Sequence, residues 1–290
     1  MYQSTKLFFL HAQTSLHAGS GSSVSVIDLP IQREKNTGFP VVAGSGVKGV
    51  LREYSENTNK NHVQIIFGPE KDGSDYAGAA GFSDAKILFY PVKSVKGVFV
   101  WITSPLVLER FIRDIQLADP SFTLKVPKIN NNNAVVTGSC VNLINNKVVL
   151  DEYDYDISGE KFTDEKKLAD LLFEAKTYWH EKFCNSLVIL PDDEFSHFVQ
   201  FATEIQARIA IDNETGVVKR GALFYEENIP SESIFYSNLF ISNPHKKDEQ
   251  LKDHEAIFNE LAKLDGKFIH LGGDKTIGKG MMKIKFYKKG

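Results

Sequence analysis

The sequence predicts an α+β protein in which helices cover one face of a sheet. Short runs rich in β-branched and aromatic residues alternate with runs whose apolar residues recur at helical spacing. We find no internal repeat and no Pro-, Gly- or Ser-rich linker that would divide the chain. With 290 residues, 42% of them hydrophobic, the chain can bury a large core and could be one large domain or a domain with insertions.

The first half of the chain predicts the order strand, helix, hairpin, helix. Ser45 is a suitable N-cap for the first helix, and Ser104 precedes a Pro, which suits the first turn of the second. A short apolar run at 39–43 leads into the first helix. The expected ranges are a strand at 6–16, a helix at 46–54, a hairpin of strands at 82–92 and 97–103, and a helix from 105 to about 117.

The second half adds a long insertion and then returns to alternating strands and helices. The expected ranges are a loop at 130–133, a helix at 162–183, a hairpin of strands at 204–211 and 217–225 with its tip at 212–216, a strand at 233–241, a helix at 248–264, a strand at 267–271, a glycine-rich loop at 272–280 and a strand at 281–287. The order β-α-β-β-α, an insertion, and β-α-β with a closing strand makes a ferredoxin-like core the natural candidate.

The composition is that of an ordinary globular protein, with 24% charged residues. No apolar run approaches the roughly 20 residues that a membrane span needs, and the first residues lack a signal-peptide pattern. Cys140 and Cys184 are isolated thiols without a CxxC or His-rich neighbourhood. Neither a zinc site nor a disulfide framework is therefore indicated, and we expect a cytoplasmic protein that does not associate with membranes.

Charge is distributed unevenly along the chain. The formal net charge is −3, yet residues 266–290 contain seven Lys and one Asp. Residues 151–200, in contrast, contain thirteen acidic and five basic residues. Because a nucleic-acid surface needs local positive charge and not a high overall charge, the average does not exclude RNA or DNA. The acidic segment is either a solvated face or a face that meets a basic partner.

Two glycine-rich turns can bring backbone amides close to a ligand. The first, residues 44–49, matches G-x-G-x-x-G and opens the expected helix, and Glu70 lies about twenty residues further on. A dinucleotide site is therefore an open alternative, although no further βαβ alternation follows. Lys48 and Arg52 lie one helical turn apart behind this turn, which suits contact with a phosphate backbone.

The second turn, residues 273–279, matches the first part of a phosphate-binding GxxxxGK loop. Gly280 stands where such a loop needs Ser or Thr, and a strand follows in place of a helix, which argues against nucleotide hydrolysis. Free amides beside Lys275 and Lys279 would still form an anion-binding concavity. A tight turn between two edge strands explains the same residues.

Three positions are candidates for chemistry: His17, Asp28, and either Glu226 or Glu227. A lone His after a strand is often a structural residue, and a lone Asp in a loop often forms a turn. Asp28 lies among apolar residues, so its loop is expected to dock on the protein. Its carboxylate could bind a divalent cation through water or orient a ribose hydroxyl. No second acid lies near it, so a two-metal site is not supported.

Five segments together resemble the RAMP superfamily of CRISPR-associated proteins, and within it the repeated backbone subunit of the type III-B (Cmr) effector complex. The resemblance spans most of the chain, and the second and third segments are the most specific. The segments are HAGSG at 17–21, IDLPIQRE at 27–34, TGFPVVAGSGVKGVLR at 37–52, GALFYEE at 221–227 and the glycine-rich loop at 272–280.

The resemblance implies one hand-shaped RAMP-type domain over residues 1–290, with a ferredoxin-like (RRM-like) palm, a helical fingers insertion and a β-hairpin thumb. Copies of such a subunit stack along a CRISPR guide RNA beside other Cmr-complex subunits, and each thumb wedges into the duplex of guide and target RNA. The implied boundaries are a palm of 1–17, 39–117 and 228–290, an insertion with fingers of 118–203, and a thumb of 204–227.

The resemblance also implies roles for individual residues. Cleavage of the complementary target RNA depends in this family on an aspartate in the loop after the first strand, where Asp28 stands. It implies a weakly bound divalent cation, Mg²⁺ or Mn²⁺, at Asp28, with His17 and Glu227 as auxiliary catalytic residues, although Glu226 is an equal choice. The implied RNA contacts are Ser45, Lys48, Arg52, Arg33, Arg208, Lys219, Arg220, Lys275 and Lys279.

The implied reaction is attack of a ribose 2′-hydroxyl on the adjacent phosphate, with the thumb splaying the strand into in-line geometry. Three other functions stay open. The chain could be a structural CRISPR RNA-binding subunit in which Asp28 only forms a turn, or an endoribonuclease that processes CRISPR RNA alone. From a different class, it could be a dinucleotide-binding enzyme, which NAD(H) would stabilise against melting.

Overall fold

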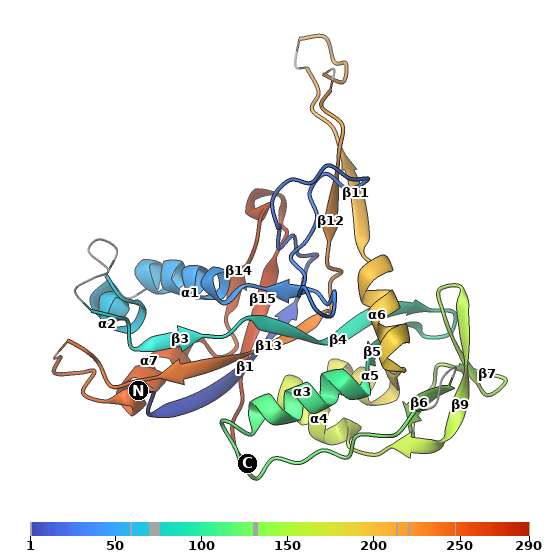
Figure 1. Ribbon diagram of the computed structural model, residues 1–290, viewed down its shortest axis with the longest axis horizontal. Helices are drawn as coiled ribbons and strands as arrows, with labels where there is room; N and C mark the ends of the chain where they lie inside the picture. The colour runs from blue at the N-terminus through green and yellow to red at the C-terminus, as the bar shows by residue number, and fades with distance from the viewer. Residues whose placement is uncertain are drawn as a thin grey trace.

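The computed structural model describes residues 2–58, 60–69, 76–129, 133–212, 214–219, 221–246 and 248–289. A long twisted sheet runs through the body, helices pack against it, and a β-hairpin projects away from it (Figure 1). The predicted α+β class is confirmed. The described helices are not long and apolar enough to cross a membrane.

The helices are α1 (Gly44–Thr58), α2 (Val63–Phe67), α3 (Pro105–Ile115), α4 (Glu165–Leu172), α5 (Tyr178–Asn185), α6 (Asp192–Phe201) and α7 (His254–Leu261), with 3-10 turns η1 (Lys60–His62), η2 (Ala262–Leu264) and η3 (Lys275–Ile277). The strands are β1 (Ser4–Ala12), β2 (Val41–Val42), β3 (Ala80–Phe82), β4 (Ala85–Ser94), β5 (Val98–Thr103), β6 (Asn133–Thr137), β7 (Leu143–Ile144), β8 (Lys147–Leu150), β9 (Tyr153–Phe162), β10 (Leu187–Ile189), β11 (Glu204–Arg208), β12 (Phe224–Asn228), β13 (Ile234–Ile241), β14 (Phe268–His270) and β15 (Met281–Phe286).

Four strands form the centre of the body, in the order β15-β1-β13-β4, and every neighbouring pair is antiparallel. In the chain, α1 lies between β1 and β4, and α7 lies between β13 and β15. Strand β14 adds one edge, and the sheet continues beyond β4 through β5, β10, β6, β9, β8 and β7. The segment expected to be a helical insertion therefore also contributes strands to the sheet.

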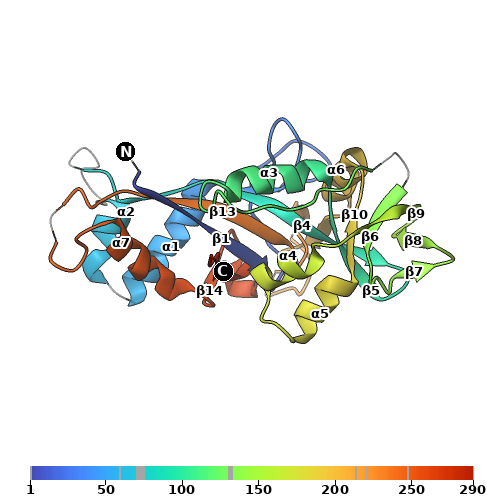
Figure 2. The same cartoon turned by 90° about the horizontal axis from the view of Figure 1, so that it is seen from below.

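Helices cover both faces of the central strands, so the expectation of one covered face was wrong. Neighbouring side chains along a strand point to opposite faces. Phe8 packs on Phe286, which in turn contacts Phe258 of α7, whereas Phe9 contacts Phe111 of α3. Figure 2 shows α3 on one side of β1 and β13, and α1 and α7 on the other. An amphipathic pattern predicts a buried stripe but not the face on which it packs.

Two expected helices differ from the structure. The helix expected at 162–183 is divided into α4 and α5, because Lys176 between them has a φ of 64° in the left-handed region. Helix α1 begins at Gly44, so Ser45 lies in its first turn and is not the N-cap. The N–H of Gly44 instead donates to Asp84 Oδ1 at 2.7 Å, a partner that no local pattern reveals.

Other expectations are confirmed. The Ser104 side chain caps α3 by accepting a hydrogen bond from the N–H of Val107, and β4 and β5 form the expected antiparallel hairpin. Strands β11 and β12 form the second expected hairpin, with Arg208 opposite Phe224 and a further bridge between Ile211 and Val218. Parts of the expected loop at 130–133 and of the hairpin tip, at residue 213, lie outside the described residues.

Candidate nucleic-acid interface

The segment after β1 and the glycine-rich loop before β15 lie directly against each other. The N–H of Gly273 donates to the His17 carbonyl at 2.9 Å, and the N–H of Gly280 donates to the Ser15 carbonyl at 2.8 Å. Gly272 has a φ of 76°, and a Cβ there would lie 2.2 Å from the His17 carbonyl oxygen. A bare backbone is therefore required where the two loops meet.

The loop that carries Asp28 docks on the base of the projecting hairpin, as its apolar neighbours predicted. Leu29 forms a parallel bridge with Glu226, and Asp28 Oδ2 accepts a hydrogen bond from the N–H of Tyr225 at 2.7 Å. Asp28 is half-buried. Among the described residues, only this one of its two carboxylate oxygens receives a hydrogen bond, so the other oxygen stays open to a ligand.

His17 is buried where these segments meet. Its Nδ1 lies 2.7 Å from the carbonyl oxygen of Glu227, and since a carbonyl can only accept, Nδ1 carries the proton in this contact. A Cβ at Gly19 would lie 2.7 Å from the other ring nitrogen, Nε2. The imidazole thus packs between backbone segments and fastens the loop to β12, which explains this residue structurally.

Glu227 is also buried, and both of its carboxylate oxygens are occupied. Oε1 accepts from Arg33 at 2.5 Å and from the Thr203 hydroxyl at 3.0 Å, and Oε2 accepts from the N–H of Ile31 at 3.0 Å. The Arg33 guanidinium also donates hydrogen bonds to the carbonyls of Gly38, Val199 and Gln200. Arg33 is therefore bonded within the protein, and its role as an RNA contact stays a prediction.

Glu226, the neighbour of Glu227, belongs to a second cluster, in which Glu226 and Lys279 are buried and the other members are half-buried. Arg208 bonds Glu226 Oε2 at 2.6 Å and also pairs with Asp274. Lys279 pairs with Glu226, lies 3.8 Å from Asp274 Oδ2, and donates to Asn228 Oδ1 at 3.0 Å. The hydrogen bond from Arg208 lowers the pKa of Asp274. We refer to Arg208, Glu226, Asp274 and Lys279 as the charge quartet.

The quartet corrects two expectations. Lys279 is buried, with only 6% of its surface exposed, so its ammonium does not face a phosphate backbone as expected. Arg208 is partly exposed, but its guanidinium is bound by two carboxylates, which raise the pKa of Arg208. Lys279 therefore acts inside the protein, whereas Arg208 is bonded to carboxylates but keeps part of its side chain exposed.

Some of the other predicted cations have no partner among the described residues, and others are bonded within the protein. Lys48 is half-buried on α1 and Lys219 is exposed on the hairpin, and neither side chain has a hydrogen bond or ion pair with a described residue. Burial, and then the charge of Arg52, lower the pKa of Lys48. Arg52 itself bonds Glu56 at 2.8 Å and the Gly68 carbonyl at 2.9 Å, so it is not free for RNA as expected.

Lys275 forms an exposed ion pair with Glu53 of α1 at 3.1 Å. Such a pair contributes little to stability, so the ammonium can exchange Glu53 for a phosphate. Ser45 is exposed in the first turn of α1, where the helix dipole attracts anions, although the amides of Gly44, Gly46 and Val47 already donate to acceptors in the protein. Arg220, another predicted contact, lies outside the described residues.

The glycine motif at the start of α1 does not form a dinucleotide site. Strand β2 before it pairs with β4 in antiparallel orientation, whereas the dinucleotide motif needs a parallel βαβ unit. A Cβ at Gly44 would lie 2.5 Å from the carbonyl oxygen of Phe82. This glycine therefore allows close packing of helix on strand.

Residues 9–283 match the family model of the RAMP superfamily. The chain belongs to this superfamily. The resemblance derived from the sequence is thus confirmed.

Relatives of the chain in this superfamily include proteins of Cmr complexes. The chain is 40% identical over 285 residues to the CRISPR system Cmr endoribonuclease Cmr4 of Pyrococcus furiosus, covering 95% of this chain and 93% of the relative. It is 27% identical over 312 residues to the CRISPR system CMR subunit Cmr4 of Saccharolobus solfataricus, covering 98% and 97%. The crystal structure of oligomeric Cmr4 from Pyrococcus furiosus superposes with a TM-score of 0.75 at 32% identity, covering 99% of this chain and 98% of that one.

The RAMP chain shows no ready-made metal centre in its described part, since no group of three or more His, Cys, Asp or Glu side chains there could hold an ion. Asp28 can supply a single carboxylate oxygen. Mg²⁺ is commonly held by one or two carboxylates together with substrate phosphates and water. The residues present therefore fit an ion that binds with RNA, and do not fit one held by protein ligands alone.

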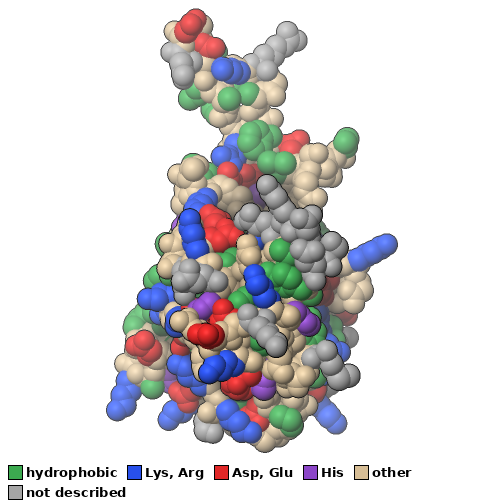
Figure 3. Space-filling view, turned by 90° about the vertical axis from the view of Figure 1, so that its left-hand side faces the viewer, with side chains coloured by type: hydrophobic (Ala, Val, Ile, Leu, Met, Phe, Trp, Pro, Cys, Tyr) green, Lys and Arg blue, Asp and Glu red, His purple; other side chains and the backbone are tan. Residues whose placement is uncertain are grey.

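The hairpin carries an apolar surface that the sequence analysis missed. Figure 3 shows hydrophobic side chains on the projecting hairpin, and Lys and Arg spread over the body beneath it. Exposed apolar residues on both strands are a signal for a contact surface. The exposed side chains are Ile205, Ile209, Ile211, Val217, Val218, Leu223 and Tyr225.

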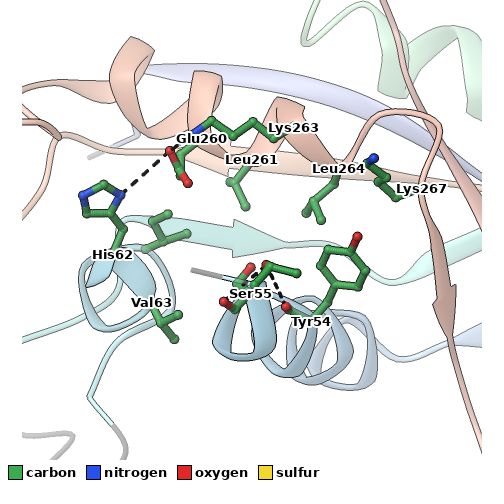
Figure 4. A pocket seen from close by; sticks show the side chains of 11 residues that line it. Tyr54, Ser55, His62, Val63, Glu260, Leu261, Lys263, Leu264 and Lys267 are labelled. Atoms are coloured by element: carbon green, nitrogen blue, oxygen red, sulfur yellow. Dashed lines mark hydrogen bonds and ion pairs between the residues drawn. The ribbon is translucent and has the colours of Figure 1, made fainter. Parts of the chain in front are cut away.

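A cavity of about 330 Å³, also missed by the sequence analysis, lies between α1, α2 and α7 (Figure 4). His62 Nδ1 lies 3.8 Å from Glu260 Oε2 across it, and Tyr54 and Leu264 help to line it. Because 198 positions separate this pair, no local motif predicts it. Helices α2 and α7, which help to line it, lie at one end of the body, away from the hairpin (Figure 1).

Proposed function

We propose that this chain is a guide-RNA-binding backbone subunit of a type III-B CRISPR effector complex in the cytoplasm, and that it cuts complementary target RNA at regular intervals. Membership of the RAMP superfamily supports this proposal, as does 40% identity to a protein named as a Cmr endoribonuclease. The likeness to an oligomeric Cmr4 supports assembly with further copies of itself, and the likeness to a CMR subunit supports assembly with other subunits.

The strand order supports a ferredoxin-like palm. Strands β15-β1-β13-β4, with α1 and α7 in the connections, have the order expected of that core. The hairpin of β11 and β12 would be the thumb, with its exposed apolar side chains facing RNA or a neighbouring copy.

One observation carries the assignment of cleavage to Asp28. Its carboxylate lies at the base of the hairpin, tied by one oxygen to the Tyr225 amide, while the other oxygen is open. A strand splayed by the thumb would pass this point. Asp28 would then orient a ribose 2′-hydroxyl for attack on the adjacent phosphate, and holding that geometry supplies much of the rate enhancement.

A divalent cation, Mg²⁺ or Mn²⁺, would be held by the open oxygen of Asp28 together with RNA phosphates, and would neutralise charge that develops on the reacting phosphate. His17 and Glu227 would hold the Asp28 loop against β12 and would not exchange protons with RNA. This departs from the roles that the resemblance implies for them, because both side chains are buried and bound within the protein.

The guide backbone would be held by groups that the protein leaves free. These are the exposed Ser45 in the first turn of α1, the ammonium groups of Lys48 and Lys219, and Lys275 after it releases Glu53. Contacts to phosphates carry no sequence information, which suits a subunit that accepts any guide.

The test is Asp28→Asn in the complex assembled on guide RNA. An Asn oxygen still accepts from the Tyr225 amide, so assembly and target binding should match those of the unchanged protein, while cutting falls by at least about a hundredfold. Cleavage is followed on end-labelled target RNA with Mg²⁺, with Mn²⁺ and with EDTA.

Asp253→Asn is the matched control. Asp253 also bonds a backbone amide, that of Ala256 at the start of α7, and this variant should cut normally. Unchanged cutting by Asp28→Asn would show that Asp28 only forms a turn, and would leave a structural RNA-binding subunit. Cutting that persists in EDTA would remove the cation from the proposal.

A further inference from the structure

The projecting hairpin depends on its base for its orientation. Strands β11 and β12 pair with each other in a sheet of their own and do not join the main sheet. Within the described chain, the β-pairing of β12 with the body is a single bridge, between Glu226 and Leu29. Backbone hydrogen bonds also tie β12 to the loop after β1, since the N–H groups of Asp28 and Leu29 donate to the Tyr225 carbonyl and that of Glu227 donates to the Leu29 carbonyl. Side-chain contacts at the base add to these bonds in setting the angle at which the hairpin leaves the body.

Two adjacent carboxylates on β12 make these contacts on opposite sides. Glu226 and Glu227 are neighbours in a strand, so their side chains point to opposite faces. Both are almost fully buried, at 1% and 3% exposed. Burying a carboxylate without a compensating charge is unfavourable. Here a different loop supplies a cation to each carboxylate, Lys279 to Glu226 and Arg33 to Glu227.

Glu226 is held by the glycine-rich C-terminal loop, and Glu227 by the loop after β1. On the first side, the charge quartet contains two cations and two anions and forms a closed ring of contacts: Arg208 and Lys279 each approach both Glu226 and Asp274. On the second side, Arg33 and the N–H of Ile31 bond Glu227.

Because the hairpin is long, a small rotation at its base produces a large movement of its tip. From Arg208, where β11 ends, to the tip is about seven residues, which span roughly 20 Å when extended. A rotation of about 10° at the base would thus move the tip by about 3 Å. Since a misplacement of about 1 Å at a reacting group can reduce a rate about a hundredfold, a loose base would disturb any reaction that the hairpin helps to position.

We propose that the charge quartet and the Arg33–Glu227 pair form a two-sided clamp that fixes the angle of the hairpin and thereby selects which phosphate of a bound RNA reaches Asp28. The residues of the clamp are positioning residues and do not touch RNA. The selection of a phosphate rests on the proposed function, whereas the fixing of the hairpin does not.

The first experiment measures the hairpin in the full chain without RNA. Spin labels at Thr215→Cys near the tip and Glu109→Cys on α3, with Cys140 and Cys184 changed to Ser, report one distance by pulsed electron resonance. Glu226→Gln with Lys279→Gln removes one charge of each sign from the quartet, so the remaining Arg208 and Asp274 still balance. We expect a narrow distance distribution in the parent and a broader one, at least about twofold, in this double variant.

Two further variants make the result specific. Lys86→Gln with Asp114→Asn removes another, partly buried pair, 2.6 Å apart between β4 and α3, and should leave the distribution narrow. Asp274→Asn is the mildest change to the quartet, because Asn adopts the left-handed φ of 62° found there and still accepts from Arg208. It should broaden the distribution even if the double variant does not fold. An unchanged distribution in Asp274→Asn and in a folded double variant would overturn the clamp.

The second experiment maps cut positions in the assembled complex. We expect the clamp variants to bind target RNA normally, to cut about tenfold or more slowly, and to spread the cuts over neighbouring phosphates. If a variant has a broader distance distribution but still cuts at the same phosphates, the clamp fixes the hairpin but does not select the phosphate. That result would overturn the second part of the proposal only. Absence of cutting by the parent complex would instead overturn the proposed function, and the distance measurement would still decide the clamp.

Discussion

Single residues at the interface mostly serve the contacts between loops. Taken from the sequence alone, three residues were predicted to be reactive or RNA-binding: His17, Glu227 and Lys279. In the structure each one is buried and bonds partners from distant parts of the chain. Asp28 differs from them because one of its oxygens is open. At this scale, the presence of a free polar atom separates a candidate for chemistry from a structural residue.

Gly272→Ala tests how tightly the two loops are joined. The φ of 76° costs an L-residue about 1–2 kcal/mol, and the overlap of the new Cβ with the His17 carbonyl costs about 1–3 kcal/mol more. Gly278→Ala is the matched control, with a φ of 84° and open space around it, and should lose only the first amount. Urea unfolding measures both, and equal losses would contradict the close contact.

Among the elements, the hairpin combines a buried charged base with an exposed apolar arm. The base is closed by the quartet and by the Asp28 loop, whereas Ile211 and Val218 near the tip are 55% and 47% exposed. Apolar side chains on both strands of an isolated hairpin stabilise little by themselves. Their place on the arm therefore indicates contact with RNA or with another copy of the chain.

Ile211→Ser with Val218→Ser should separate stability from assembly. Because both side chains are exposed, the free energy of unfolding should change by less than about 0.5 kcal/mol. Assembly on guide RNA, followed by light scattering, should weaken by about tenfold or more because the arm loses its apolar contact. Val95→Ser, in the turn after β4 and 63% exposed, is the control and should assemble normally. Normal assembly of the double variant would exclude the arm as a contact surface.

At the scale of the whole molecule, four of the predicted RNA-binding cations are bonded within the protein. Arg33, Arg52, Arg208 and Lys279 all bond carboxylates or carbonyls, so fewer of the predicted contacts are left for RNA. The described chain offers Lys48 and Lys219 as unpaired candidates on α1 and the hairpin. Each copy should thus make few phosphate contacts, and affinity should come from many copies on one guide.

The salt dependence of guide-RNA binding tests this view. Each lysine that contacts a phosphate of single-stranded RNA contributes about −0.7 to the slope of log K against log salt. Lys48→Gln and Lys219→Gln should each flatten the slope per copy by about this amount. Lys147→Gln, whose ammonium pairs with Asp154 at 2.6 Å on β8 and β9, should not change it. Fluorescence anisotropy over a salt series measures the slopes, and an unchanged slope in the first two variants would exclude them as contacts.

Local patterns predicted the elements that local chemistry determines. Ser104 caps α3 and the β11–β12 hairpin pairs as expected, since caps and turns depend on a few consecutive residues. The α+β class and the docking of the Asp28 loop followed from apolar spacing in the same way. The start of α1 could not be predicted, because its Gly44 amide is bonded by the distant Asp84.

The sequence by itself determined the class of fold, the positions of most elements, the family and the candidate aspartate. Only the tertiary structure decided which charged side chains are free. Lys279 and Glu226 are 53 positions apart, and a lysine in a glycine-rich loop reads as a surface residue until the facing strand is known. The physical reason is that secondary structure follows from neighbours along the chain, whereas burial and ion pairing depend on neighbours in space.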